Sequence, residues 1–153
     1  MKIVNVIDED FVNYKKVSMV IGFPYCSFKC GKDICQNSQL SESELIDLSI
    51  NKLIERYMNN QYSNAIVCAG LEPFDSWDDL YELVSSLRKY TDDDFIIYTG
   101  YNKFEIEDKI AILSQFKNII VKFGRYINNN KSIYDEILGI NLASDNQYAE
   151  RIS

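Results

Sequence analysis

The chain has 153 residues, of which 46% are hydrophobic and 25% are charged, a composition typical of one globular domain with a single core. Its 16 basic and 23 acidic residues give a net charge of −7, which disfavours direct binding to nucleic-acid phosphates. The absence of histidine excludes a histidine general base, a Ser-His-Asp triad and every metal site that needs imidazole. Any chemistry must therefore come from cysteine, carboxylate, lysine or tyrosine side chains, or from a cofactor.

The N-terminal segment carries Asp8, Glu9 and Asp10, which is unlike a signal peptide. The longest apolar runs, such as residues 17–23, have the length of a strand and are far too short to span a membrane. We therefore expect a cytoplasmic protein that is not attached to a membrane. In that reducing compartment, four cysteines favour metal binding or redox chemistry over disulfides.

The first predicted elements are a strand and a helix. The apolar segment at residues 16–23 predicts a first buried strand that ends at Pro24. Ser41 and Glu44 have the spacing of a capping box, so we expect a helix to begin at Ser41. The apolar stripe of this helix is formed by Leu45, Leu48, Leu53, Ile54 and Tyr57.

The same alternation of strand and helix patterns continues along the chain. Ser76 predicts the start of a helix over residues 77–90, and Asn102 with Glu105 predicts a capping box ahead of another helix. Three further buried strands, each followed by a glycine, are predicted at residues 64–69, 95–99 and 118–123.

Repeated β-α units predict an α/β fold in which helices cover a mostly parallel sheet. Right-handed crossovers then place the C-terminal ends of the parallel strands at one edge, where ligands bind in such sheets. The polar tail from residue 128 is expected to be loop, with a short helix near Tyr134–Leu138. No linker or repeat divides the chain, so we expect residues 1–153 to form one domain.

Cys26, Cys30 and Cys35 follow the first predicted strand with the spacing C-x3-C-x4-C. Free thiols are one interpretation, although free cysteines are usually buried singly. A structural zinc site is a second; it would take Cys68 as its fourth ligand, but this spacing is not that of a zinc knuckle. An iron–sulfur cluster held by three thiolates is a third, and it would leave one iron open to a small molecule. Cys68 lies within an apolar strand, where core packing is the simpler interpretation.

Other stretches accompany the cysteine loop in a fixed order. Residues 9–14 precede the first strand, and Asn37 follows the third cysteine. Gly70–Pro73, residues 98–101 and residues 124–126 then follow the later strands. In this order the chain resembles the radical S-adenosylmethionine (SAM) superfamily, and most closely the activating proteins of anaerobic (class III) ribonucleotide reductases. Residues 9–14 resemble the family's D-I-V-N segment, and Gly70–Pro73 resembles its Gly-Gly-Glu/Asp-Pro element. Residues 98–101 resemble its T-G-Y element, and residues 124–126 resemble its Gly-Lys/Arg-Phe element.

The resemblance has two departures. The family spacing is usually C-x3-C-x2-C, so this chain has two additional residues between Cys30 and Cys35, which a bulge at Gly31 would absorb. Leu71 stands where the family has its second glycine.

The resemblance implies a partial, open TIM-like barrel that binds a 4Fe-4S cluster and SAM. The implied cluster ligands are Cys26, Cys30 and Cys35. The implied SAM-binding residues are Ile34, Gln36, Gly70, Leu71, Glu72 and Thr99. Among these, Glu72 would bind the SAM amino group and Thr99 its ribose or carboxylate. Because Glu72 follows a strand end, we expect its replacement to have little effect on folding.

The implied activity is that of an activase that generates a glycyl radical on a partner, the large subunit of an anaerobic ribonucleotide reductase. An external electron donor such as flavodoxin or ferredoxin would reduce the cluster, and the protein partner would close the open side of the barrel. Two alternatives stay open: a non-catalytic iron–sulfur or zinc module for electron transfer or assembly, and an activase of a different glycyl radical enzyme. The acidic run at residues 92–94 is expected to be a solvated loop and not a metal site.

Overall fold

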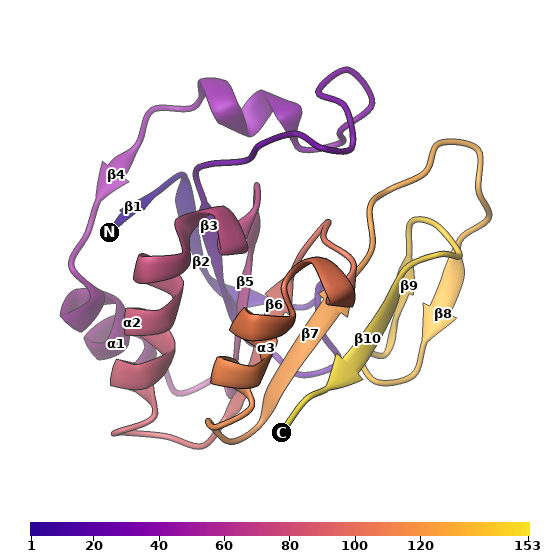
Figure 1. Cartoon of the computed structure of the whole chain (residues 1–153). Coiled ribbons are helices and arrows are strands. Elements are labelled where there is room, and N and C mark those ends of the chain that lie inside the picture. Colours follow the sequence, from indigo (N-terminus) through magenta and orange to yellow (C-terminus); the bar gives the residue numbers. More distant parts are fainter.

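The computed structural model describes residues 1–153 and has a six-stranded sheet at its centre (Figure 1). The strand order is β10-β7-β6-β5-β3-β2. The four inner strands run parallel to one another, whereas β2 and β10 are antiparallel to their neighbours at the two edges. These strands are β2 (Asn5–Asp10), β3 (Ser18–Phe23), β5 (Ala65–Gly70), β6 (Asp94–Tyr98), β7 (Ile119–Phe123) and β10 (Tyr148–Arg151).

The predicted α/β class with a mostly parallel sheet is confirmed, and all four predicted strands are present with bounds that shift by only one or two residues. The sheet has two free edges, so it does not close into a barrel. The strand predicted to be first, β3, is preceded in the sheet by the edge strand β2. In β2 the side chains alternate between exposed and half-buried, and its acidic sequence suits an edge that faces water.

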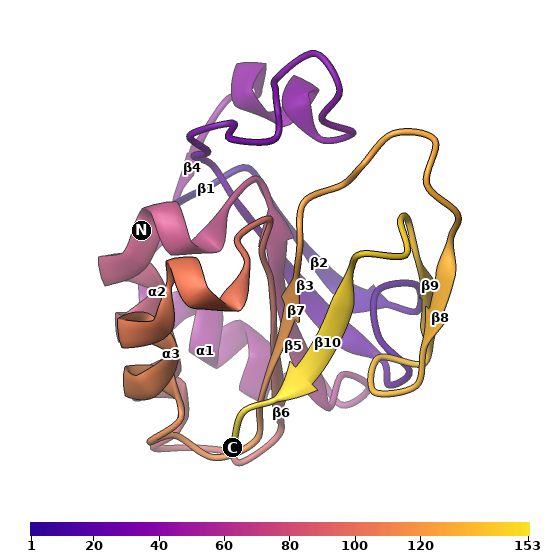
Figure 2. The ribbon, with the colours of Figure 1, turned by 45° about the vertical axis from the view of Figure 1, so that its right-hand side comes forward.

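Helices cover one face of the sheet, and a hairpin with the β2–β3 loop covers part of the other (Figure 2). The helices are α1 (Ile50–Met58), α2 (Trp77–Leu87) and α3 (Glu107–Leu113), with short 3-10 helices η1 (Ser38–Glu42), η2 (Pro73–Ser76) and η3 (Lys103–Glu105). The hairpin consists of β8 (Ile133–Asp135) and β9 (Ile140–Leu142), and a further small pair joins β1 (Lys2–Ile3) to β4 (Ile46–Asp47). None of the helices has the length and apolar character that a membrane span requires.

Alternate side chains of the parallel strands bury two layers of core. The helix-facing layer contains Cys68, which is 0% exposed, so its predicted place in the core is confirmed. The opposite layer contains Val20, Val67, Ile96 and Ile120, which pack against residues of the hairpin and of the β2–β3 loop. Burial on both faces explains why these strands are continuous apolar runs rather than alternating ones.

The prediction of a helix from Ser41 is wrong. Ser41 lies within η1, and the chain then becomes extended in β4 to pair with β1. The backbone N–H of Leu48 donates to the carbonyl of Met1 at 3.1 Å, which extends this pairing. Helix α1 begins only at Ile50, with Ser49 as its N-cap. The capping-box pattern failed because pairing with the chain's own N-terminus takes up the backbone groups of the segment that follows it.

The prediction for the tail is also wrong, because it forms β8, β9 and β10 and has no helix at residues 134–138. Asp135 holds these strands together. Its carboxylate accepts hydrogen bonds from the backbone N–H groups of Leu138 at 2.9 Å and Ala149 at 2.8 Å. The hairpin is joined to the β2–β3 loop by the N–H of Lys15, which donates to the carbonyl of Leu138 at 2.8 Å. These contacts are distant in sequence, so no local pattern reveals them.

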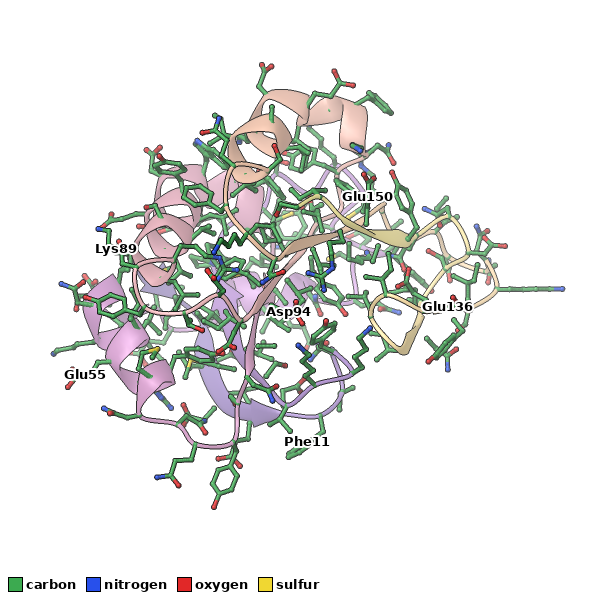
Figure 3. All side chains as sticks on the ribbon, turned by 90° about the horizontal axis from the view of Figure 1, so that it is seen from below. Phe11, Glu55, Lys89, Asp94, Glu136 and Glu150 are labelled. Carbon is green, nitrogen blue, oxygen red and sulfur yellow. The ribbon has the colours of Figure 1, made fainter.

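The prediction that the acidic run at residues 92–94 is a solvated loop is wrong for Asp94. Asp94 begins β6 and is 6% exposed. Its carboxylate accepts a hydrogen bond from the hydroxyl of Tyr14 at 2.9 Å and forms ion pairs with Lys16 and Arg151. Figure 3 views the molecule from the end opposite to the cysteine loop and shows Asp94 near the middle of that end. The network joins β6, β10 and the β2–β3 loop at the N-terminal ends of the parallel strands.

Gly70 lies where the backbone of β5 approaches that of β3 too closely for a side chain. Its φ is +88°, and a Cβ atom there would lie 2.8 Å from the backbone nitrogen of Phe23. Gly31 has a similar φ of +92°, but its Cβ would meet only the side chain of Ile34, at 3.5 Å. Gly31→Ala should therefore cost about 1–2 kcal/mol of stability from backbone strain alone. Gly70→Ala should cost about 1–3 kcal/mol more, because backbone atoms must move apart. Denaturant unfolding measures both, and equal losses would contradict the close approach.

Candidate functional site

The C-terminal ends of the parallel strands open on one cavity of about 390 Å³. The cysteine loop, residues 24–37, crosses this end of the sheet at the top of Figure 1. All nine residues that the sequence analysis assigned to cluster or SAM binding line the cavity, although they come from three separate parts of the chain. They are Cys26, Cys30, Ile34, Cys35, Gln36, Gly70, Leu71, Glu72 and Thr99.

The cysteine loop is fastened to the end of β5 at both of its own ends. At its start, the N–H of Glu72 donates to the carbonyl of Tyr25 at 2.8 Å. At its end, the side-chain amide of Asn37 donates to the carbonyl of Gly70 at 2.8 Å. Between them Gly31 takes a positive φ, as the predicted bulge requires, and its N–H donates to the carbonyl of Phe28 at 2.8 Å.

The three loop cysteines are half-buried free thiols, whereas Cys68 lies in the helix-facing layer and does not line the cavity. Burial raises the pKa of the Cys26 thiol to about 11 and also raises the pKa of Cys30. No three cysteine or carboxylate groups converge closely enough to hold a single metal ion. Thiolates of an iron–sulfur cluster bind separate irons and do not converge on one point. Three free thiols at one cavity are the donor number of a cluster with one open iron, and the zinc interpretation loses its fourth ligand because Cys68 lies in the core.

Glu72 is buried and is only 5% exposed. Its Oε1 accepts hydrogen bonds from the N–H of Phe74 at 3.1 Å and from the hydroxyl of Thr99 at 2.8 Å. Its Oε2 accepts from the N–H of Gly100 at 2.9 Å. Glu72 therefore joins the end of β5 to the end of β6. Its burial contradicts the assumption behind the small folding effect predicted from its place at a strand end, so we now expect its loss to lower stability. A carboxylate has about four acceptor positions, so one position on Oε2 stays free.

Thr99 does not present a free hydroxyl to the cavity. The hydroxyl donates to Glu72 and accepts from the N–H of Tyr101 at 3.0 Å, and the residue is 3% exposed. Its observed role is therefore to orient Glu72 and the turn that follows β6. A serine or threonine hydroxyl has one proton, and here a protein carboxylate already takes it.

Lys122 is a cavity residue that the sequence analysis missed. It lies in β7 and is 7% exposed, and its ammonium donates to a single partner, the carbonyl of Gly124, at 3.0 Å. It forms no ion pair, and the ring of Tyr98 lies 5.9 Å away. Burial lowers the pKa of Lys122 to about 8, so the amine is mostly protonated at neutral pH. The signal in the sequence was one charged residue inside an otherwise apolar strand.

A comparison with protein-family models matches residues 15–147 to the 4Fe-4S single cluster domain. The chain belongs to this family. The match contains the cysteine loop, all four parallel strands and every cavity residue except Val12 and Asn13. A 4Fe-4S cluster is therefore the cofactor that this family assigns to the chain, in agreement with the three thiols at the cavity. Searches of curated proteins and of solved structures found no significant match.

The cysteines give the next prediction. Each of the variants Cys26→Ala, Cys30→Ala and Cys35→Ala should lose most of its iron and the brown colour after anaerobic reconstitution. Cys68→Ala should keep both, because Cys68 lies in the other layer of the core. Iron analysis with absorption spectra checks this. An equal loss of iron from Cys68→Ala would show ligation by four thiolates and would leave no open iron.

Glu72 should make stability depend on pH. Burial raises its pKa from 4.5 to about 7, so the folded chain binds more protons than the unfolded chain between these values. Its contribution is fully present below pH 4.5 and is lost as the pH rises through 7, a decrease of about 3 kcal/mol at most. Glu72→Gln should remove this part of the pH dependence.

Urea unfolding at pH 5 and pH 8 measures this effect, with Glu82→Gln on the exposed side of α2 as the control. Glu72→Gln should also lower stability at both pH values, because an amide NH₂ then faces the N–H of Gly100. If wild type and Glu72→Gln lose the same stability between the two pH values, the raised pKa is contradicted.

Proposed function

We propose that the chain is a radical SAM activase, which uses its 4Fe-4S cluster and SAM to generate a glycyl radical on an anaerobic ribonucleotide reductase. The observation that carries the proposal is the meeting of three separate sequence elements at one cavity. These are the three-cysteine loop, the Gly70–Pro73 turn and the Thr99–Tyr101 turn. The order of these elements is that of the radical SAM activating proteins, and the open sheet would correspond to part of their barrel.

The chemistry begins at the cysteine loop. Three thiolates on a four-iron cluster leave one iron without a protein ligand, which is the position that a chelating small molecule needs. When bound together, the reduced cluster and SAM supply a 5′-deoxyadenosyl radical and methionine. The residues of this chain would bind and orient SAM and exclude water from the reacting atoms.

A buried carboxyl group and a buried ammonium in the cavity fit the amino-acid end of SAM. Glu72 keeps one free acceptor position on Oε2, which suits an ammonium group. Lys122 keeps two of its three N–H donors free, which suits a carboxylate. The two side chains both line the cavity but form no ion pair with each other. A bound α-amino acid group, which carries both charges, would satisfy both residues at once.

The chain itself covers more of the cavity than had been expected. Hairpin residues Ile140, Asn141 and Leu142 line it, as does Val12 of the β2–β3 loop, which is 72% exposed. A protein partner would therefore need to close only the remaining opening. We propose the large subunit of the reductase as this partner and flavodoxin or ferredoxin as the electron donor, both in the reducing cytoplasm.

A non-catalytic iron–sulfur module for electron transfer or assembly is the second candidate. It is favoured by the two additional residues between Cys30 and Cys35 and by Leu71 at the position of a family glycine. Such a module would use the cluster without SAM. An activase of a different glycyl radical enzyme would share the proposed chemistry and differ only in its partner.

The two candidates differ in their response to SAM. In the activase, adding SAM to the reduced, reconstituted chain should change the paramagnetic resonance spectrum of the cluster. Lys122→Met should keep its iron but bind SAM about ten- to a hundredfold more weakly, the cost of a lost charge-assisted hydrogen bond. Lys117→Met is the matched control, because Lys117 lies on the surface and pairs only with Asp92. A wild-type spectrum that SAM does not alter would contradict the activase and favour the module.

A further inference from the structure

We infer that Asp75 and Tyr101 form a positioning pair that holds the Cys26–Cys30 half of the cysteine loop, and that retention of the cluster depends on this pair. The inference rests on the 4Fe-4S cluster of the family and does not require the activase function. Neither residue is a cluster ligand, and Asp75 does not line the main cavity.

The carboxylate of Asp75 links the cysteine loop to Tyr101, with one oxygen bound to each. Its Oδ2 accepts a hydrogen bond from the backbone N–H of Ser27, the residue after Cys26, at 2.6 Å. Its Oδ1 accepts from the hydroxyl of Tyr101 at 2.6 Å. The hydroxyl of Ser27 lies 3.3 Å from that of Tyr101, which closes a three-membered network. Hydrogen bonds to an ionised carboxylate are stronger than those between neutral groups.

Tyr101 is itself fixed by its backbone to two strand ends. Its N–H donates to the hydroxyl of Thr99 at 3.0 Å, and its carbonyl accepts from the N–H of Gly124 at 3.0 Å. Its ring also contacts the loop, because the ammonium of Lys29 lies 4.6 Å from the ring centroid. Tyr101 therefore holds the loop at two positions, on either side of Phe28, from a rigid support.

The other half of the loop, residues 31–36, has no hydrogen bond to the sheet, and its one ion pair, between Lys32 and Glu42 at 4.0 Å, lies on the surface. The backbone hydrogen bonds around residues 31–36 are local turns, such as that from the N–H of Cys35 to the carbonyl of Lys32 at 3.3 Å. The next hydrogen bond to the sheet comes from Asn37. Cys26 and Cys30 thus lie in the half that Asp75 and Tyr101 hold, and Cys35 lies in the half whose hydrogen bonds before Asn37 are local. Loss of the pair would leave the loop attached to the sheet mainly near its two ends, at Tyr25 and Asn37, which would make release of the cluster easier.

The experiment compares iron retention in Tyr101→Phe and Asp75→Asn with that in the wild type. Each anaerobically reconstituted chain is mixed with an iron chelator in the absence of SAM, and the rate of iron release is followed. We expect release to be about tenfold faster in both variants, the factor expected for one lost hydrogen bond to a charged group. Phenylalanine keeps the ring and its contact with Lys29, so the fold should persist. The resonance spectrum of the reduced cluster should broaden as its ligand loop becomes less fixed.

Tyr57→Phe is the matched control. Tyr57 lies on α1, away from the cavity, and its hydroxyl donates to the carboxylate of Asp93 at 2.7 Å. This variant loses the same kind of bond and should release iron at the wild-type rate. Unchanged release in both test variants would overturn the inference, and so would an equal acceleration in Tyr57→Phe. A wild type that binds no cluster would overturn both the inference and the family cofactor. A missing response to SAM would count against the activase alone, since chelation is measured without SAM.

Discussion

The buried carboxylate of Glu72 is the contact on which the arrangement of the site depends. It lies where two parallel strands end, and burying its charge is costly unless hydrogen bonds compensate. Three donors from the β5 and β6 ends supply that compensation. Because these donors belong to the two turns that line the cavity, the carboxylate sets how the turns face each other. The backbone N–H of Glu72 also donates to the carbonyl of Tyr25 and so joins the start of the cysteine loop to the same residue.

The cavity combines this carboxylate with a buried ammonium on the next strand but one. Lys122 and Glu72 share the cavity without pairing, so each retains capacity to bind a ligand group. A fold that buries a carboxyl group and an ammonium without an ion pair between them loses stability through desolvation, and a zwitterionic ligand would recover part of that loss. This pattern of charged groups, together with three thiols at the same opening, is the reason for proposing a SAM enzyme rather than a simple electron-transfer module.

Much of the sheet and of the site could be predicted from the sequence, because the deciding signals are local. Buried parallel strands are apolar runs ended by glycine, and parallel strands bring the residues that follow them to one edge. Thus the cysteine loop, Glu72 and Thr99 could be placed together. The start of α1, the β8–β9 hairpin and the burial of Glu72 depend on pairings between distant segments, which short patterns do not encode. Lys122 was missed because an isolated lysine in a strand has no motif around it.

We propose that three loop thiolates hold one 4Fe-4S cluster whose fourth iron is open to the cavity. Mössbauer spectroscopy of the chain reconstituted with ⁵⁷Fe, recorded before and after addition of SAM, tests it most directly because each iron is observed. We predict a four-iron cluster in which one iron changes its isomer shift when SAM is added while the other three stay as they were. Four irons that all remain unchanged by SAM, or the absence of a four-iron cluster, would contradict the account.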